Sequence, residues 1–182
     1  MWGGDDKLPQ GKNRSSDLFF HRQLCKAQRQ SSAGGSCRFT AAGFPKNKKD
    51  HPFQIDAIVV LPDHLHCIWT LPHGDANYKT RWALIKASFS RQIPGGETRS
   101  ASRVKRGERG LWQRRYWEHL IRDDLDYQRH VDYIHWNPVK HGLVRQVDQW
   151  PHSSFHAHVK QGICPAIWAG EPADMVDVGE MG

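Results

Sequence analysis

Two kinds of segment are missing from this chain of 182 residues. It contains no uninterrupted apolar run of the roughly 18 residues that a membrane-spanning helix needs, and it does not start with a secretory leader pattern. Its four cysteines include no Cys-x-x-Cys pair, which argues against a zinc ribbon and against a dithiol redox site. The sequence therefore predicts a cytoplasmic protein with reduced thiols and no membrane contact, built as one domain with tails.

Acidic residues are too few to balance the basic ones. The chain has 26 Lys and Arg against 19 Asp and Glu, a formal net charge of +7, which predicts a polyanionic partner. The excess is concentrated between Arg99 and Arg115, and eight tryptophans offer rings on which the bases of a single strand can stack. The alternative is a solvated basic loop beside tryptophans of the core. The candidate nucleic-acid contacts in this segment are Arg103, Lys105, Arg106, Arg114 and Arg115.

Two apolar, β-branched runs predict a pair of strands. They cover residues 53–61 and 64–70, and Pro62-Asp63 between them indicates a tight connection. Because residues two apart in a strand share a face, His64 and His66 should project side by side, with Leu65 on the opposite face. Such a pair can hold one divalent metal ion, although most histidine pairs of this spacing are simply an exposed polar face.

The other elements are predicted from periodicity. Residues 77–91 place Tyr78, Trp82, Ile85 and Phe89 on one helical stripe, with Asn77 as a possible cap. Residues 94–110 are predicted to be a loop and residues 111–122 a strand. Residues 1–50 show no sustained period and are predicted to be loop or disordered.

A second helix is predicted from Asp123-Asp124 to Asn137-Pro138. Its buried stripe is expected to be Tyr127, Val131 and Ile134. Tyr133 lies off that stripe with Asn137 one turn beyond it, so both side chains could reach a neighbouring site. The remaining tyrosines fall on apolar stripes or within the predicted strand, which leaves Tyr133 as the best candidate nucleophile; ordinary amphipathic packing is the alternative.

Several histidines and a lysine lie near this helix or after it. His135 and His141 are expected to contact phosphate or to cap the helix. Lys140 is expected to contact the phosphate backbone, without a catalytic role. A further cluster, His152, His156 and His158, is expected to be a polar surface.

Three motifs resemble one known family. They are Val60-Leu-Pro-Asp-His-Leu-His66, Leu111-Trp-Gln-Arg-Arg-Tyr-Trp-Glu-His119 and Val131-Asp-Tyr-Ile-His-Trp-Asn-Pro-Val-Lys-His-Gly142. They are similar to motifs of the REP-associated tyrosine transposases, in the single-tyrosine branch of the histidine–hydrophobe–histidine (HUH) endonucleases. The resemblance covers roughly residues 53–170. It implies an α/β (α+β) fold, with a ferredoxin-like antiparallel sheet and helices packed on one face.

The resemblance also implies the chemistry. His64, His66 and Asn137 would hold Mg²⁺ or Mn²⁺, and Tyr133 would attack the scissile phosphate of single-stranded or hairpin (REP-type) DNA. The product would be a 5′-phosphotyrosine and a free 3′-OH, so the same site could rejoin strands without ATP. Two other classes stay open: a hairpin-binding protein without turnover, and a metal-dependent nuclease that uses water. The sequence leaves open whether the protein is a monomer or a homodimer.

One segment departs from the family. Its members begin with a strand that residues 1–50 lack in the given reading frame, although back-translation one base later restores a similar pattern near residues 16–24. We hypothesise that the gene carries compensating frameshifts in this segment, and the coding DNA would test this. The chain would then be a decayed copy with weak or no activity. The predicted organisation is a divergent segment 1–50, a catalytic domain 51–145 and a C-terminal tail 146–182.

Overall fold

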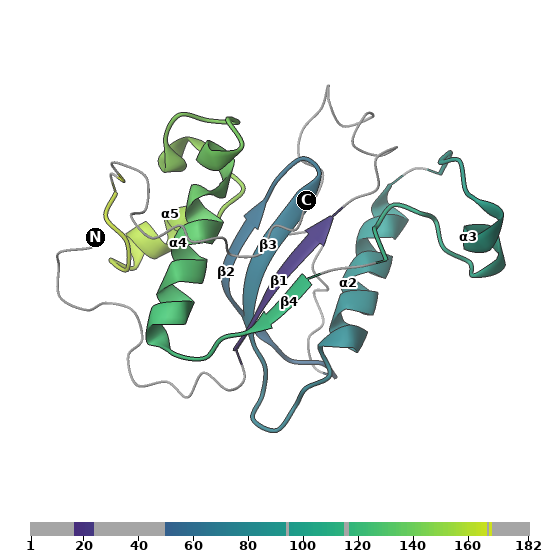
Figure 1. The fold of residues 1–182 in the computed structure, drawn as a ribbon, viewed down its shortest axis with the longest axis horizontal. Helices are drawn as coiled ribbons and strands as arrows, with labels where there is room; N and C mark the ends of the chain where they lie inside the picture. The colour runs from purple at the N-terminus through teal and green to yellow at the C-terminus, as the bar shows by residue number, and fades with distance from the viewer. Residues whose placement is uncertain (1–16, 24–49, 94, 115–116, 167, 169–182) are drawn as a thin grey trace.

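A four-stranded antiparallel sheet forms the centre of the protein (Figure 1). The computed structural model describes residues 17–23, 50–93, 95–114, 117–166 and 168. Its strands are β1 (Asp17–Gln23), β2 (Gln54–Val60), β3 (His64–Thr70) and β4 (Trp117–Leu120), in the order β2-β3-β1-β4. All three pairings between these strands are antiparallel, which confirms the predicted ferredoxin-like sheet.

The hairpin of β2 and β3 confirms the two strands predicted from the apolar runs. Pairing extends from Gln54 opposite Thr70 to Val60 opposite Leu65. The connection through Pro62 and Asp63 is closed by the Leu61 N–H, which donates to the His64 carbonyl at 2.8 Å. The position of the two histidines at the start of β3 is therefore fixed by a short, hydrogen-bonded turn.

Strand β1 overturns the prediction of loop or disorder for its part of residues 1–50. It lies in the middle of the sheet, paired with β3 on one side and β4 on the other. Phe19 and Phe20 are both fully buried, on opposite faces, because successive side chains of a strand alternate. The strand therefore exists in the given reading frame, which removes the missing strand as a reason for expecting a decayed copy. The other residues of the hypothesised frameshift lie largely outside the described part of the chain.

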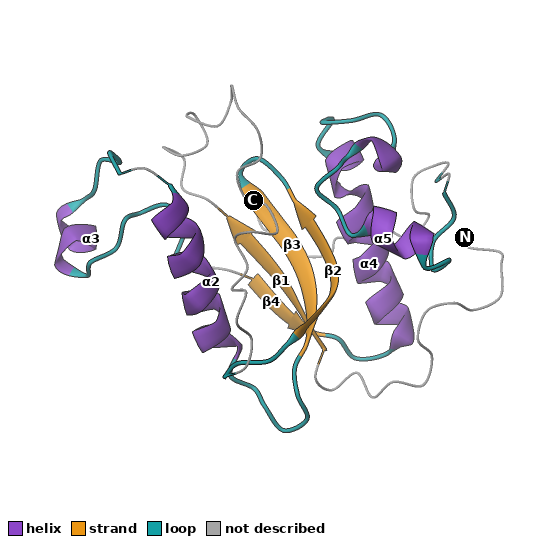
Figure 2. Ribbon diagram, turned by 180° about the vertical axis from the view of Figure 1, so that it is seen from behind, coloured by secondary structure: helices purple, strands orange, loops and turns teal. Residues whose placement is uncertain are grey.

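The two long helices lie on opposite faces of the sheet (Figure 2). Helix α4 (Asp124–Lys140) packs its Tyr127, Val131 and Ile134 stripe against the Phe19 face, as predicted. Helix α2 (Tyr78–Gln92) packs against the Phe20 face. The expectation that the helices share one face is therefore wrong for α2 and α4. Strand β3 is buried on both sides, so each face of the sheet is covered by a helix. No helix in the described ranges has the length and apolar character needed to cross a membrane.

Helix α2 confirms the helix predicted over residues 77–91. The Asn77 side chain accepts the Thr80 N–H and caps the first turn. The predicted loop that follows, residues 94–110, contains a short helix, α3 (Ala101–Lys105). The strand predicted over 111–122 is shorter than expected, since Trp112 packs against Phe89 of α2 and only Trp117–Leu120 pairs with β1.

Helix α4 begins where the sequence predicts but ends later. The Asp123 side chain accepts the Asp126 N–H at the first turn. The helix does not stop at Asn137-Pro138; it continues to Lys140, because a proline removes only its own N–H and the next amides still find acceptors. The end is closed by Gly142, whose φ of +65° lets it donate to Val139 while Leu143 donates to Pro138.

The segment after residue 146 packs on the back of α4. It contains the 3₁₀ helix η3 (Val147–Gln149) and α5 (Phe155–Lys160). The Ser154 N–H donates to Ile58 and the Val60 N–H donates to His152, so this segment also lies along edge strand β2. The boundary between a catalytic domain 51–145 and a tail 146–182 remains a prediction.

The central position of β1 can be tested by removing one of its core side chains. We expect Phe19→Ala to lower the free energy of unfolding by about 3–5 kcal/mol, because a large ring leaves a cavity between β1 and α4. Leu120→Ala, in a side chain that is 51% exposed, is the control and should stay within about 0.5 kcal/mol of the parent. Urea unfolding followed by circular dichroism measures both. Equal stability of the two variants would contradict a central β1.

Candidate active site

The histidine pair lies on the face of β3 that α4 covers. His64 and His66 have 7% and 0% of their surface exposed, and their ring centroids are 5.0 Å apart. Leu65, between them, belongs to the core on the α2 side. The predicted side-by-side arrangement is therefore confirmed, whereas the alternative of an exposed polar face is not what the structure has.

A carboxylate fixes the first of these rings. His64 Nδ1 lies 2.6 Å from an oxygen of Asp63, and since a carboxylate only accepts, Nδ1 carries the proton. The lone pair of this ring then belongs to Nε2, the usual arrangement for a histidine that binds metal. Sequence reasoning treated Asp63 only as a turn residue, although an acidic neighbour next to a histidine is a usable signal.

Tyr133 is buried against the histidine pair. Its ring centroid is 5.1 Å from that of His66 and 6.3 Å from that of Phe19. Only 2% of the residue is exposed, and it belongs to the same core cluster as Val131 and Ile134. The prediction that Tyr133 stands off the packing stripe is thus wrong: His66 extends the packing surface of the sheet far enough to cover it.

Lys140 meets the hydroxyl of the candidate nucleophile. Its Nζ donates to the Tyr133 hydroxyl at 3.4 Å and lies 4.8 Å from the centre of that ring. Seven residues, two helical turns, separate them, so both project from the same side of α4. We expected Lys140 only to contact phosphate, so this contact with Tyr133 is a role that the sequence did not reveal.

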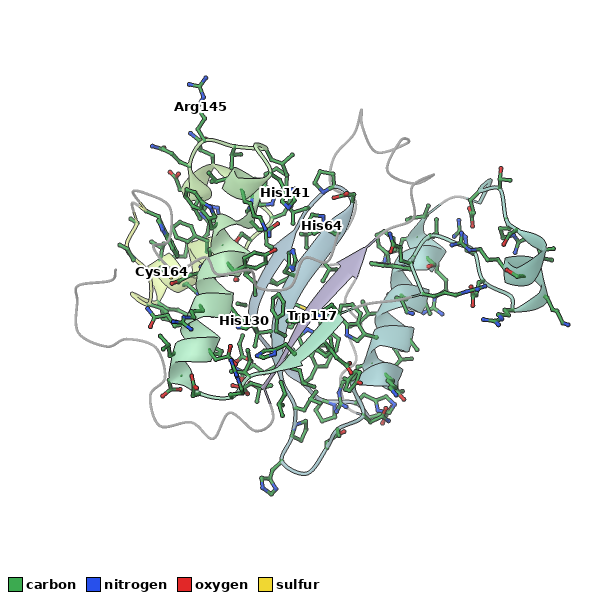
Figure 3. The ribbon with its side chains drawn as sticks, viewed as in Figure 1. His64, Trp117, His130, His141, Arg145 and Cys164 are labelled. Atoms are coloured by element: carbon green, nitrogen blue, oxygen red, sulfur yellow. The ribbon has the colours of Figure 1, made fainter. Side chains whose placement is uncertain are left out.

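Asn137 and His141 complete this side of α4. Tyr133, Asn137 and His141 follow one another at intervals of four residues, so they lie on one side of the helix. The Tyr133 ring contacts the His66 ring, and the centre of the His141 ring is 5.0 Å from that of the His64 ring (Figure 3). Asn137 therefore lies between these contacts and faces the histidine pair. It is fully buried, and neither its amide nitrogen nor its amide oxygen has a hydrogen-bond partner in the described part of the chain.

This donor set fits a divalent cation. A buried amide without partners is costly unless something else binds it, and an amide oxygen is a ligand that hard cations accept. Two imidazoles and an amide oxygen suit Mg²⁺ or Mn²⁺ better than a closed tetrahedral zinc site. The structure thus brings His64, His66, Asn137, Tyr133, Lys140 and His141 together at one end of α4.

A second polar network anchors the other end of this helix. His119 of β4 lies 2.7 Å from the Asp126 carboxylate, which also accepts the Arg122 N–H. Burial alone would raise the pKa of Asp126, but these hydrogen bonds outweigh it and hold the pKa below its usual value. His130 stacks on His119, and burial lowers the pKa of His130. The network joins α4 to the sheet.

Two predictions about the remaining histidines are wrong. His135 neither caps the helix nor faces solvent; it is fully buried, with Nε2 3.1 Å from the Ser154 hydroxyl. His158, expected on a polar surface, is also buried, and its Nε2 donates to the Asp56 carbonyl at 2.9 Å. Both belong to the back of α4, where the segment around α5 packs.

The basic segment lies far from these groups. Helix α3 extends beyond α2, on the side of the sheet opposite α4 (Figure 1). Lys105 and Arg106 are exposed there, whereas Arg103 donates to the Gly110 carbonyl and Arg114 pairs with Glu108 at 2.9 Å. Arg115 lies outside the described residues. The four described candidates of this segment, Arg103, Lys105, Arg106 and Arg114, therefore lie apart from the candidate active site, whereas Lys140 and His141 lie within it.

Arg109, in the same segment, is a structural residue. It forms an ion pair with Glu97 and donates to the Ser90 and Ile93 carbonyls at the end of α2. The hydrogen bond from Arg109 to the Glu97 carboxylate lowers the pKa of Glu97 to about 2. The pairing holds the base of the basic segment against α2.

Comparison with known proteins places the chain among relatives of one kind. No model of a known protein family matches it. It is 49% identical to the REP-associated tyrosine transposase of Escherichia coli (strain K12) over 129 residues. These aligned residues make up 71% of this chain and 70% of that protein. A Haemophilus influenzae protein is 49% identical over 133 residues, 72% of this chain and 75% of its own length. A solved structure of the REP-associated tyrosine transposase bound to a REP hairpin matches with a TM-score of 0.67 and 39% identity, over 92% of this chain and 93% of that one.

The role of Asp63 can be tested through metal affinity. We expect Asp63→Ala to weaken Mn²⁺ binding about 10–100-fold, because the carboxylate orients the His64 ring and fixes its tautomer. Titration of free Mn²⁺ by electron paramagnetic resonance measures the affinity. Asp148→Ala, an exposed carboxylate of η3, removes the same charge and should leave the affinity unchanged. Identical affinities for the two variants would show that Asp63 does not support a metal ligand.

Proposed function

The chain belongs to the REP-associated tyrosine transposases, and from this premise and its site geometry we propose that it cleaves and rejoins single-stranded, REP-type hairpin DNA through a 5′-phosphotyrosine. The observation that carries the proposal is the contact of the Tyr133 ring with His66, with the Lys140 ammonium at the Tyr133 hydroxyl. A nucleophile, a metal-binding pair and a cation meet at one point, which is what phosphoryl transfer by tyrosine needs.

The metal site in this proposal consists of His64, His66 and Asn137. A divalent cation bound there, Mg²⁺ or Mn²⁺, would polarise the scissile phosphate and offset the charge that develops in the transition state. His141, exposed beside His64, is positioned to contact the DNA backbone at the edge of the same site.

Tyr133 performs the exchange of bonds. Its phenolic oxygen loses its proton to solvent and forms a bond to phosphorus while the bond from phosphorus to the 3′-oxygen breaks, and the leaving 3′-oxygen takes up a proton from solvent. Lys140 stabilises the phenolate by its charge and its hydrogen bond. Attack by a 3′-OH on the phosphotyrosine reverses the exchange, so the energy of the phosphodiester is kept and no ATP is needed. Burial by Phe19 and His66 limits access of water to this bond.

Hairpin DNA is the partner that this proposal carries over from the solved relative, whose description names a bound REP hairpin. The active site and the basic segment lie on opposite sides of the sheet, so one DNA molecule that touches both must pass around its edge. Lys105 and Arg106 would hold the phosphates of the flanking strand or stem. We also propose that residues 51–145 form the catalytic domain, between the segments 1–50 and 146–182, and that the protein acts in the cytoplasm.

Covalent capture tests the mechanism. A hairpin oligonucleotide labelled at its 3′ end should label the protein in the presence of Mg²⁺ or Mn²⁺, because the downstream fragment stays on the tyrosine. We expect Tyr133→Phe to lose this adduct and to slow cleavage by at least about three orders of magnitude, since Phe keeps the packing but not the nucleophile. His64→Ala and His66→Ala should abolish cleavage and keep most of the hairpin binding.

Tyr78→Phe is the matched control, because its hydroxyl pairs with Glu118 on the α2 side and it should keep the adduct. Cleavage that persists in Tyr133→Phe with free 5′-phosphate ends would establish a water-using nuclease instead. Hairpin binding without cleavage by the folded parent chain would establish a binding protein, as expected of a decayed copy.

The basic segment is tested by the dependence of binding on salt. We expect the Lys105→Gln, Arg106→Gln double variant to bind the hairpin more weakly and to reduce the slope of log K against log salt by about 1–2, because fewer counterions are released. A control with the same loss of charge is Lys79→Gln, Lys160→Gln, both exposed outside the segment. Fluorescence anisotropy at several salt concentrations measures the slope. A slope equal to that of the parent would remove these residues from the interface.

A further inference from the structure

Three potential metal ligands meet behind α4, outside the active site. They are His135 of α4, His158 of α5 and Cys164 in the turn after α5, and one ligand atom of each lies within 4.8 Å of the others. All three residues are buried, and the Cys164 sulfur is 4.0 Å from His135 Nδ1. Figure 3 shows Cys164 on the side of α4 that faces away from the sheet. His135 follows Tyr133 by two residues, about 200° around the helix, so the two sites share no side chain.

Hydrogen bonds orient both imidazoles toward this meeting point. The Asp56 carbonyl can only accept, so His158 Nε2 carries the proton and His158 Nδ1 the lone pair. His135 Nε2 faces the Ser154 hydroxyl, which also accepts the Ile58 N–H, and this leaves His135 Nδ1 toward the sulfur. Histidines that bind metal are held in this way, by a protein acceptor on the other ring nitrogen.

One atom of the cluster has nothing to bind within the protein. His158 Nδ1 is buried and has no hydrogen-bond partner among the residues that the structure describes. An orphaned lone pair in the interior is unfavourable. Because this lone pair lies with a thiol and a second imidazole, a cation in their midst would satisfy all of them at once.

The imidazole and the thiol of this cluster differ in their readiness to bind a cation. Burial lowers the pKa of His158, so this ring is neutral and able to donate a lone pair. Burial, with the Asp132 carboxylate nearby, raises the pKa of the Cys164 thiol to about 12. The thiol therefore keeps its proton until a cation displaces it, and that proton leaves to solvent on binding.

We propose that His135, His158 and Cys164 bind one Zn²⁺ ion, with a water molecule in the fourth position, as a structural site separate from the catalytic metal. Two imidazoles and one thiolate match the ligand preference of zinc and are a poor match for Mg²⁺ or Mn²⁺. The ion would tie α5 and its following turn to the back of α4, and through the Asp56 and Ser154 contacts to edge strand β2.

Cobalt is the probe, because a Co²⁺–thiolate bond gives a charge-transfer absorption band. The ligands proposed for the active site, His64, His66 and Asn137, contain no sulfur and cannot give this band. The full chain is unfolded with a chelator and refolded with Co²⁺. We expect the band together with the visible spectrum of tetrahedral cobalt, and its loss on adding one equivalent of Zn²⁺. Cys164→Ser and His158→Gln should lose the band, whereas Cys67→Ala, a buried thiol on the α2 face, should keep it.

The chain as purified supplies an independent measurement. It should contain close to one equivalent of zinc, and removal of that zinc should lower Tm by roughly 5–10 °C if zinc had been present at about 100 times its Kd. Circular dichroism checks that each variant is folded. A folded parent without the cobalt–thiolate band, or a band that survives Cys164→Ser, would overturn the proposal and leave the cluster as buried packing. DNA cleavage is read separately, so its failure would not affect this result.

Discussion

The packing of α4 on the β1 and β3 face determines where every candidate catalytic group lies. The contact is hydrophobic at its centre, where Tyr127, Val131 and Ile134 are buried against Phe19 and its neighbours. Each fully buried side chain of this kind contributes about 1.5–3 kcal/mol, so the stripe is strong enough to fix the rotation of the helix about its axis. Polar groups then fix its position along the axis: the Asp123 cap and the His119–Asp126 pair at one end, and the Gly142 closure at the other. Tyr133 is positioned by all of these contacts together.

The same helix separates two chemical environments. On its front, Asn137 and the histidines of β3 present oxygen and nitrogen donors beside a tyrosine and a lysine. On its back, His135 meets His158 and the Cys164 sulfur. These donor sets differ in softness, and selectivity between metals follows from that difference rather than from affinity alone. A hard cation such as Mg²⁺ would therefore favour the front of the helix over the thiol-containing cluster on its back.

Sequence reasoning succeeded where the signal is local. The histidine pair, the capped helix α2, the start of α4 and its buried stripe follow from the spacing of residues within a few turns of one another. It failed for β1, because Phe19 and Phe20 are buried on opposite faces and such a strand shows no alternation of apolar and polar residues. It also failed for the burial of Tyr133 and for the His135–Cys164 contact, since these depend on pairings across the fold that no local period encodes.

The end of α4 shows how a small error in an element hides part of a site. A helix that stopped at Asn137-Pro138, as the proline predicts, would leave Lys140 and His141 in a loop with no defined direction. The continuation to Lys140, closed by Gly142 in its left-handed conformation, keeps both residues on the helical spacing of Tyr133. That spacing is what brings the Lys140 ammonium to the Tyr133 hydroxyl and the His141 ring to His64. The turn that follows Pro138 is therefore part of the candidate active site, because the backbone conformation there aims two of its side chains.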